Sequence, residues 1–147
     1  MTIQIYGIRH CDTMKKAFAW LDSHGLEYSF HDYKKAGVPM AELRHWLEHW
    51  DWEVLINRKG TTWRRLPEHE REIVVDAESA LKLMETHPSL IRRPILTNGD
   101  QGLLGFDVEA WAQALGDAYR SRHHQRNQEA AGDVAKEKKQ ANEEFQR

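Results

Sequence analysis

The sequence predicts an α/β fold in which one mixed sheet is interrupted by an inserted helical subdomain. Three observations predict it: a strand–helix–strand pattern at the start, a helical pattern over about residues 38–87, and a hairpin followed by a helix after them. A strand–helix–strand unit usually places its two strands parallel, whereas a hairpin pairs its strands antiparallel. The two patterns together predict a sheet with both kinds of pairing.

The first unit begins with alternating apolar residues, which predict a strand that ends at Gly7. After a short loop, Asp12 or Thr13 is expected to cap a helix. The apolar residues at helical spacing in it are Met14, Ala17, Phe18 and Leu21. Gly25 is suited to end this helix, and the alternation over residues 26–30 predicts a second strand.

The middle of the chain is predicted to be helical. Pro39 opens a segment with apolar residues at helical spacing, residues 52–56 form a short apolar turn, and residues 63–66 form a short helical piece. Asp76 is expected to be the N-cap of a helix over residues 77–85. These pieces make up the predicted helical subdomain.

The last periodic part predicts a hairpin and a helix. Residues 94–97 and 103–106 read as strands on either side of a glycine-rich turn over residues 98–102. Asp107 is then expected to cap a helix that Gly116 closes. The predicted domain therefore runs over residues 1–116.

Residues 117–147 differ in composition. They are rich in Gln, Asn, Lys, Glu and Arg, and their charges nearly cancel. We expect a charged tail that is partly helical or disordered, with a partner-binding helix as the alternative.

The composition of the 147 residues bounds the class of protein. Hydrophobic residues make up 40% and charged residues 30%, and the net charge is −2, so nothing favours binding to nucleic acid or an anionic membrane. No apolar run approaches the ~20 residues that span a bilayer. The chain begins without a signal-peptide pattern, and the cytoplasm is therefore the expected location.

Cys11 is the one cysteine, so an internal disulfide and a thiolate-rich metal site are both excluded. It stands just before the first predicted helix, where unpaired N–H groups and the helix dipole stabilise a thiolate. Such placement lowers a thiol pKa below its ordinary value of ~8.5. Arg9, His10 and Lys15 add positive charge, and these polar neighbours favour a reactive thiol over the alternative of a small buried core residue.

Three segments in order resemble the ArsC/Spx family, in its YffB-like branch: residues 5–17, 55–60 and 88–95. The resemblance runs from about residue 2 to residue 116, and the three motifs together are specific. It implies a thioredoxin-like fold related to that of arsenate reductases.

The same resemblance implies the site. Cys11 would be the nucleophile, and Arg58 and Arg93 would converge near it to bind an oxyanion or glutathione. Pro94 matches the cis-proline position of thioredoxin-like proteins, where a cis bond would turn the Arg93 backbone toward the thiol. A trans proline opening an edge strand is the alternative. The other residues assigned to the binding site are Arg9, Thr13 and Lys15.

Three positions depart from the family pattern. Residues 102–106 lack the third arginine of ArsC arsenate reductases, and Gly7 stands where the ArsC loop has a histidine. Met14 replaces the second cysteine of the Cys-x-x-Cys pair that Spx-type regulators use, which excludes an internal redox switch. These departures weaken the expectation of arsenate reduction.

The sequence therefore predicts a glutathione-dependent thiol–disulfide oxidoreductase, with glutathione as co-substrate, a disulfide or oxyanion as substrate, and no metal. One alternative is an arsenate reductase. Another is a non-enzymatic Spx-like regulator that binds RNA polymerase.

Two other patterns are weaker. His45 and His49 fit an H-x-x-E-H zinc pattern, but no third ligand is evident. Four tryptophans of the middle segment are expected to serve packing, with a partner-binding surface as the alternative: Trp46, Trp50, Trp52 and Trp63.

Overall fold

The structure is a computed structural model that describes residues 2–116, so the predicted tail over residues 117–147 lies outside the described residues. The elements in chain order are β1 (Ile3–Gly7), α1 (Asp12–Ser23), β2 (Tyr28–Asp32), α2 (Tyr33–Ala36), α3 (Met40–His49), α4 (Trp52–Leu55), α5 (Thr61–Arg65), α6 (Glu68–Glu72), α7 (Ala77–Thr86), the 3-10 helix η1 (Pro88–Leu90), β3 (Ile95–Asn98) and β4 (Gln101–Leu104). Residues 108–116 are also helical. No helix of the described part is long and apolar enough to cross a membrane.

The four strands form one mixed sheet in the order β2-β1-β3-β4. β1 pairs parallel with β2 and antiparallel with β3, and β3 pairs antiparallel with β4. Helices α3 to α7 lie in the chain between β2 and β3. The predicted α/β class is therefore confirmed, as a thioredoxin-like sheet with a helical insertion.

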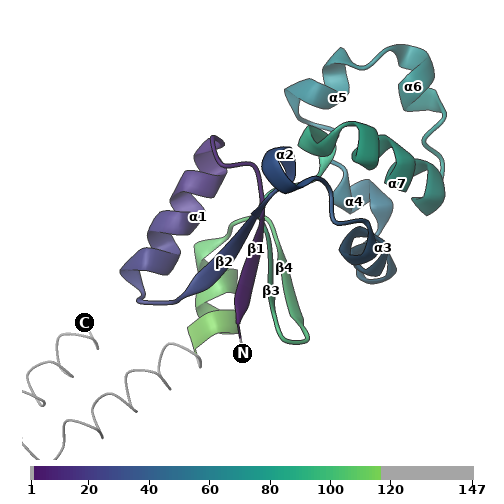
Figure 1. Ribbon diagram of the computed structural model, residues 1–147. Helices are drawn as coiled ribbons and strands as arrows, with labels where there is room; N and C mark the ends of the chain where they lie inside the picture. The colour runs from purple at the N-terminus through teal and green to yellow at the C-terminus, as the bar shows by residue number, and fades with distance from the viewer. Residues whose placement is uncertain (1, 117–147) are drawn as a thin grey trace, which may run out of the picture.

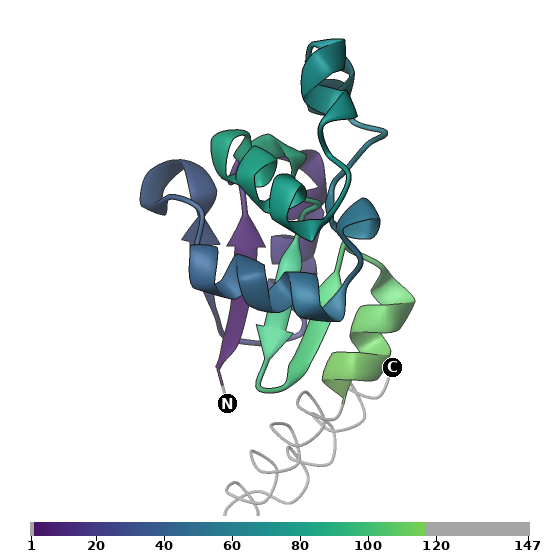
Figure 2. The same cartoon turned by 90° about the vertical axis from the view of Figure 1, so that its right-hand side faces the viewer.

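Side chains of β1 alternate between the two faces of the sheet, as a strand requires. Ile3 and Ile5 face α1 and the helix at residues 108–116, where they join a buried cluster with Trp111. Tyr6 faces the other side, and its ring meets that of Trp46 on α3 edge-on, with the ring centres 4.8 Å apart. Figures 1 and 2 show α1 and α3 on opposite faces of the sheet.

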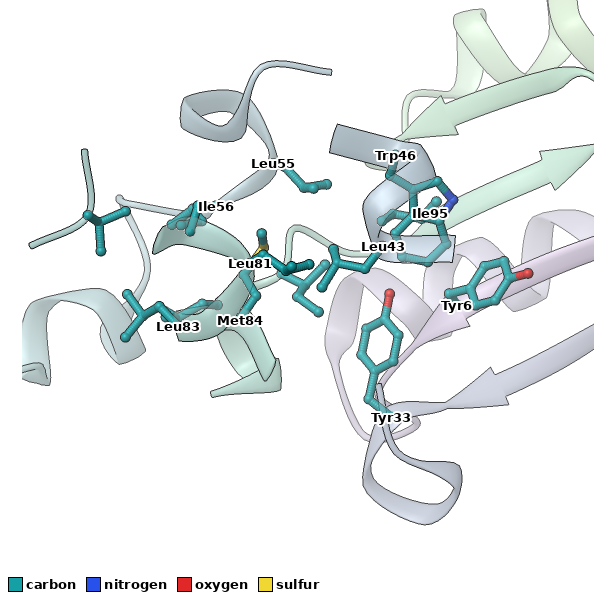
Figure 3. Packing of buried hydrophobic residues seen from close by; sticks show 14 of the residues in the cluster. Tyr6, Tyr33, Leu43, Trp46, Leu55, Ile56, Leu81, Leu83, Met84 and Ile95 are labelled. Carbon is teal, nitrogen blue, oxygen red and sulfur yellow. The ribbon is translucent and has the colours of Figure 1, made fainter. Parts of the chain in front are cut away.

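The helical insertion shares its core with the second face of the sheet. Figure 3 shows Leu43 and Trp46 beside Ile95 at one end of this cluster, with Leu81 and Met84 of α7 farther along it. Helices α5 and α6 lie farthest from the sheet (Figures 1 and 2). The four tryptophans expected to serve packing all contact this cluster, with one of them buried and the others partly buried: Trp46, Trp50, Trp52 and Trp63.

Asp76 caps α7 as predicted. Its carboxylate accepts the Ser79 N–H at 2.9 Å, and the Ser79 hydroxyl in turn accepts the Asp76 N–H at 3.1 Å. This reciprocal pair is a capping box, and it fixes the start of the helix.

Several predicted boundaries were wrong by one or two residues. The carbonyl of Cys11 accepts the Lys15 N–H at 3.0 Å, so Cys11, rather than Asp12 or Thr13, is the N-cap of α1. Gly25 ends that helix with φ 64°, as predicted, but the Leu26 N–H also bonds to a helical carbonyl, so β2 starts only at Tyr28.

The structure also contains two short helices that the sequence did not predict, α2 and α6. The hairpin turn is tighter than expected, because only residues 99–100 separate β3 from β4. Short elements like these carry too few apolar residues for a periodicity to show.

Candidate active site around Cys11

Cys11 lies at the end of the loop that joins β1 to α1. Its backbone is extended (φ −108°, ψ 135°), which is the usual N-cap conformation, and its side chain is half-buried. The side chain of an N-cap residue lies beside the first free N–H groups of the helix. The fold therefore places a sulfur where many helices place a capping oxygen.

The pKa of the Cys11 thiol lies below its ordinary value. Burial alone would raise this pKa, but the N–H of Met14, the guanidinium of Arg93 and the N–H of Thr13 lower it, and the lowering prevails. All three groups favour the thiolate because they place positive charge beside the sulfur.

A cavity of about 360 Å³ opens at the thiol. The residues that line it come from the start of α1, from the segments on either side of the insertion, and from the loop after β4: Cys11, Thr13, Asn57, Arg92, Arg93, Leu104, Gly105, Phe106 and Asp107. Four separate parts of the chain therefore form the cavity into which Cys11 opens.

Arg93 is fixed from two sides. Its Nη1 donates to the carbonyl of Ser89 at 2.7 Å, and the peptide bond to Pro94 is cis, as the resemblance implied. The Nε of Arg93 is buried and has no hydrogen-bond partner among the described residues. The Arg93 guanidinium also forms a hydrogen bond that favours the Cys11 thiolate.

The loop after β4 forms another part of the cavity wall. The Gly105 N–H donates to the Pro94 carbonyl at 2.8 Å, and the Gly105 carbonyl accepts the ring N–H of Trp111 at 3.0 Å. Asp107 caps the helix at residues 108–116, as predicted, by accepting the Glu109 N–H at 3.1 Å. These bonds hold the loop against the segment that carries Arg93.

The structure brings Thr13 and Arg93 to the cavity with Cys11, and it places the other predicted cations elsewhere. The guanidinium of Arg9 lies over the ring of Phe30, 5.2 Å from its centre. Lys15 is exposed on α1 and does not line the cavity.

Arg58, which the resemblance places near Cys11 with Arg93, is not among the residues that line this cavity. Its Nη2 lies 3.3 Å from the Glu53 carboxylate, and its guanidinium lies 5.9 Å from the ring centre of Trp52. The side chain of Asn57, one residue earlier, lines the cavity in its place.

Three lining residues were missed as site residues: Asn57, Arg92 and Asp107. Asn57 and Arg92 adjoin the two arginines of the family motifs, so their position in the sequence was a signal. Which of two neighbouring side chains enters a cavity depends on packing that the sequence does not display.

The zinc pattern on α3 leads to a pair of histidines only. The Nε2 atoms of His45 and His49 lie 3.2 Å apart, and both residues border a separate cavity of about 620 Å³ between α3 and the β3–β4 hairpin. Among residues 2–116 no group of three or more His, Cys, Asp or Glu side chains is placed to hold a metal ion.

Comparison with known proteins gives consistent matches. A protein-family model described as the ArsC family matches residues 6–114. The solved structure of a YffB protein is 46% identical, with a TM-score of 0.74, over 78% of this chain and 99% of the other. That of an arsenate reductase (ArsC) related protein from Brucella melitensis is 47% identical, with a TM-score of 0.62, over 77% and 93%.

Two sequence relatives cover the same region. An uncharacterised protein of Haemophilus influenzae is 38% identical over 113 residues, which are 77% of this chain and 98% of the relative. The global transcriptional regulator Spx of Streptococcus pneumoniae is 27% identical over 114 residues, which are 76% of this chain and 84% of the regulator.

Proposed function

This chain belongs to the ArsC family, and on that premise we propose that it is a glutathione-dependent thiol–disulfide oxidoreductase. One observation carries the proposal. Cys11 lies at the N-cap of α1 in a cavity with Arg93, and the pKa of its thiol is lowered. A lowered pKa increases the share of thiolate, and a thiolate open to a cavity is the nucleophile that disulfide exchange requires.

The proposed reaction has two exchange steps. In the first, the Cys11 thiolate attacks the glutathione sulfur of a mixed disulfide. The old S–S bond breaks, a Cys11–glutathione disulfide forms, and the released thiolate takes a proton. In the second, the thiolate of another glutathione attacks the glutathione sulfur of that disulfide, which frees the Cys11 thiolate and yields oxidised glutathione. The second thiol comes from outside because Cys11 is the only cysteine.

Arg93 is the proposed partner of the substrate's anionic group. Its guanidinium lies close enough to the thiol to lower the thiol pKa, and a charged donor binds a carboxylate more strongly than a neutral one does. Thr13 presents the first turn of α1 to the same cavity, and Pro94 holds the Arg93 backbone at the start of β3. Arg9 and Lys15 contribute a positive potential at longer range.

The proposed mechanism uses glutathione as co-substrate and needs no metal, because thiol–disulfide exchange is complete with two sulfur nucleophiles. A compartment that supplies reduced glutathione, such as the cytoplasm, is the matching location.

The test is a coupled assay in which glutathione reductase and NADPH report turnover of bis(2-hydroxyethyl) disulfide with glutathione. We expect Cys11→Ser to abolish turnover and Arg93→Gln to raise the KM for glutathione. Arg65→Gln is the matched control, because Arg65 is exposed on α5 and lies outside the cavity. Turnover that survives in Cys11→Ser overturns the proposal.

Arsenate reduction is the second candidate function. The 47% identical relative is an arsenate reductase (ArsC) related protein, and the guanidinium of Arg93, which lines the cavity, suits an oxyanion as well as a carboxylate. Arsenate-dependent oxidation of glutathione by the wild type, and its loss in Cys11→Ser, would favour this function over disulfide exchange.

The similarity to Spx keeps a regulatory role as the third candidate, with RNA polymerase as the partner. Co-purification with RNA polymerase that is retained in Cys11→Ser, together with no turnover by the wild type, would favour that role.

A further inference from the structure

A second arginine enters the Cys11 cavity, and it is not the one that the family motifs indicate. Arg92 lines the cavity together with Cys11 and Arg93, whereas Arg58 does not. Arg92 therefore has the position for a role that the resemblance gives to Arg58.

Arg92 is held by the end of α4. Its backbone N–H donates to the Leu55 carbonyl at 2.9 Å, and its side-chain Nε donates to the Val54 carbonyl at 2.8 Å. Both acceptors belong to the last turn of a helix, where carbonyls lack helical partners. These two bonds fix the backbone and the Nε of Arg92. The two Nη groups remain available as hydrogen-bond donors to a bound molecule.

No carboxylate of the described residues forms an ion pair with Arg92. Arg58 differs, because the Glu53 carboxylate already lies 3.3 Å from its Nη2, with both side chains about half exposed. An arginine that is oriented and unpaired loses little on binding an anion, since it exchanges only water for the new partner. Arg92 meets that condition and Arg58 does not.

The cavity also contains a negative group. Asp107 lines the same cavity as the arginines, and its carboxylate lies at the start of the last described helix, where it accepts the Glu109 N–H. This carboxylate repels a small, multiply charged oxyanion in the same cavity, whereas a longer molecule with a carboxylate at one end and an ammonium elsewhere matches both signs. The charges of the cavity thus favour a zwitterionic, amino-acid-bearing thiol or disulfide.

We propose that Arg92 binds a carboxylate of the amino-acid-bearing thiol or disulfide that reacts with Cys11, and that Arg58 has no part in this binding. The proposal rests on the proposed function, because it concerns the substrate of the same thiol. It makes Arg92 a determinant of which disulfide reacts, while the chemistry stays with Cys11.

The test uses single exchange events, which need no catalytic cycle. The rate at which Cys11 forms a mixed disulfide is measured by mass spectrometry with two probes. One probe is oxidised glutathione, which carries carboxylates and ammonium groups. The other is bis(2-hydroxyethyl) disulfide, which carries neither.

We expect Arg92→Gln to slow the reaction with oxidised glutathione about tenfold, the scale of one charge-assisted hydrogen bond in a partly exposed site. The same variant is expected to react with bis(2-hydroxyethyl) disulfide within twofold of the wild type. Arg92→Lys, which keeps the charge, is expected to recover part of the lost rate. Arg58→Gln and the control Arg65→Gln are expected to react with both probes within twofold of the wild type.

Three results would overturn the proposal. Equal slowing of both probes by Arg92→Gln would mean that Arg92 only supports the end of α4. Selective slowing by Arg58→Gln would return the role to Arg58. An unchanged rate with oxidised glutathione in Arg92→Gln would remove the carboxylate contact while leaving the reductase proposal intact. A wild type that reacts with neither probe would instead overturn the proposed function.

Discussion

The side chain of Met14 fills the space that a side chain at position 7 would need. A Cβ on Gly7 would lie 2.5 Å from the Met14 sulfur and 2.8 Å from its terminal methyl, and Met14 is fully buried. Two departures from the family pattern are therefore linked by direct packing. The missing side chain at Gly7, in place of a histidine, leaves the space that Met14, in place of the second cysteine, fills.

This contact predicts the effect of Gly7→Ala. The added methyl group overlaps the far end of the Met14 side chain, which is flexible but fully buried, so we expect a cost of about 1 kcal/mol of unfolding free energy, the low end for overpacking. Urea denaturation of the purified variant measures the loss. The matched control is a double-mutant cycle with Met14→Ala, in which Gly7→Ala should cost less because its clashing partner is gone. Additive effects in that cycle would show that the contact is not the cause.

Met14→Cys should create an internal redox pair with Cys11. The N–H of Met14 already lies beside the Cys11 thiol, and a cysteine three residues along a helix is within disulfide reach. With excess oxidised glutathione, the wild type should stop at one bound glutathione, while the variant should release it and form an internal disulfide. Mass spectrometry distinguishes the two products, and a variant that keeps the bound glutathione contradicts the prediction. Cys11→Ser/Met14→Cys is the control that cannot close the ring.

The lowered pKa of the Cys11 thiol sets the pH dependence of its reactivity. The rate of alkylation by iodoacetamide should reach half its maximum below the ordinary thiol value of ~8.5. Arg93→Gln should move this midpoint upward, because it removes a positive group that favours the thiolate. If Arg93→Gln leaves the midpoint unchanged, Arg93 does not contribute to the lowered pKa of the Cys11 thiol.

The same pKa links stability to pH. The unfolded chain holds the Cys11 proton up to the ordinary pKa, whereas the folded chain releases it at lower pH. The contribution of the thiolate to stability is therefore full above the ordinary thiol pKa and is lost as the pH falls through the folded-state pKa. The difference in unfolding free energy between wild type and Cys11→Ser, measured across this range, should grow with pH. A constant difference would contradict the shift.

Trp111 supports the part of the cavity wall that the loop after β4 forms. It is almost fully buried, and its ring N–H donates to the Gly105 carbonyl at 3.0 Å. Trp111→Phe removes this donor and some volume, which should cost about 1–3 kcal/mol and slow mixed-disulfide formation at Cys11. Thermal unfolding and the exchange assay measure the two effects. Trp20→Phe, which trims a neighbouring ring on α1, is the control, and an equal loss of exchange rate in it would remove the special role of the Gly105 contact.

Local chemistry explains what the sequence predicted correctly. Three features depend on only a few adjacent residues: the alternation of β1, the Asp76 cap of α7 and the glycine that ends α1. Their local chemistry is therefore enough to predict them. The position of Cys11 at the start of α1 also followed from the sequence, and the pKa of its thiol is lowered there. Short helices such as α2 and α6 were missed because their packing, rather than their pattern, makes them helical.

The sequence by itself thus determined the α/β class, the single cysteine and the family to which the chain belongs. The tertiary structure decided which second arginine lines the cavity with Cys11 and Arg93. An isolated bridge pairs Ile56 with Ile91, and it places Arg92 on the end of α4 and inside the cavity. Arg58 lies two residues after the same bridge, but its side chain is placed beside the Glu53 carboxylate. Such a choice depends on contacts between segments more than 30 residues apart, as in the 38-residue separation of Arg92 from Val54, which no local pattern encodes.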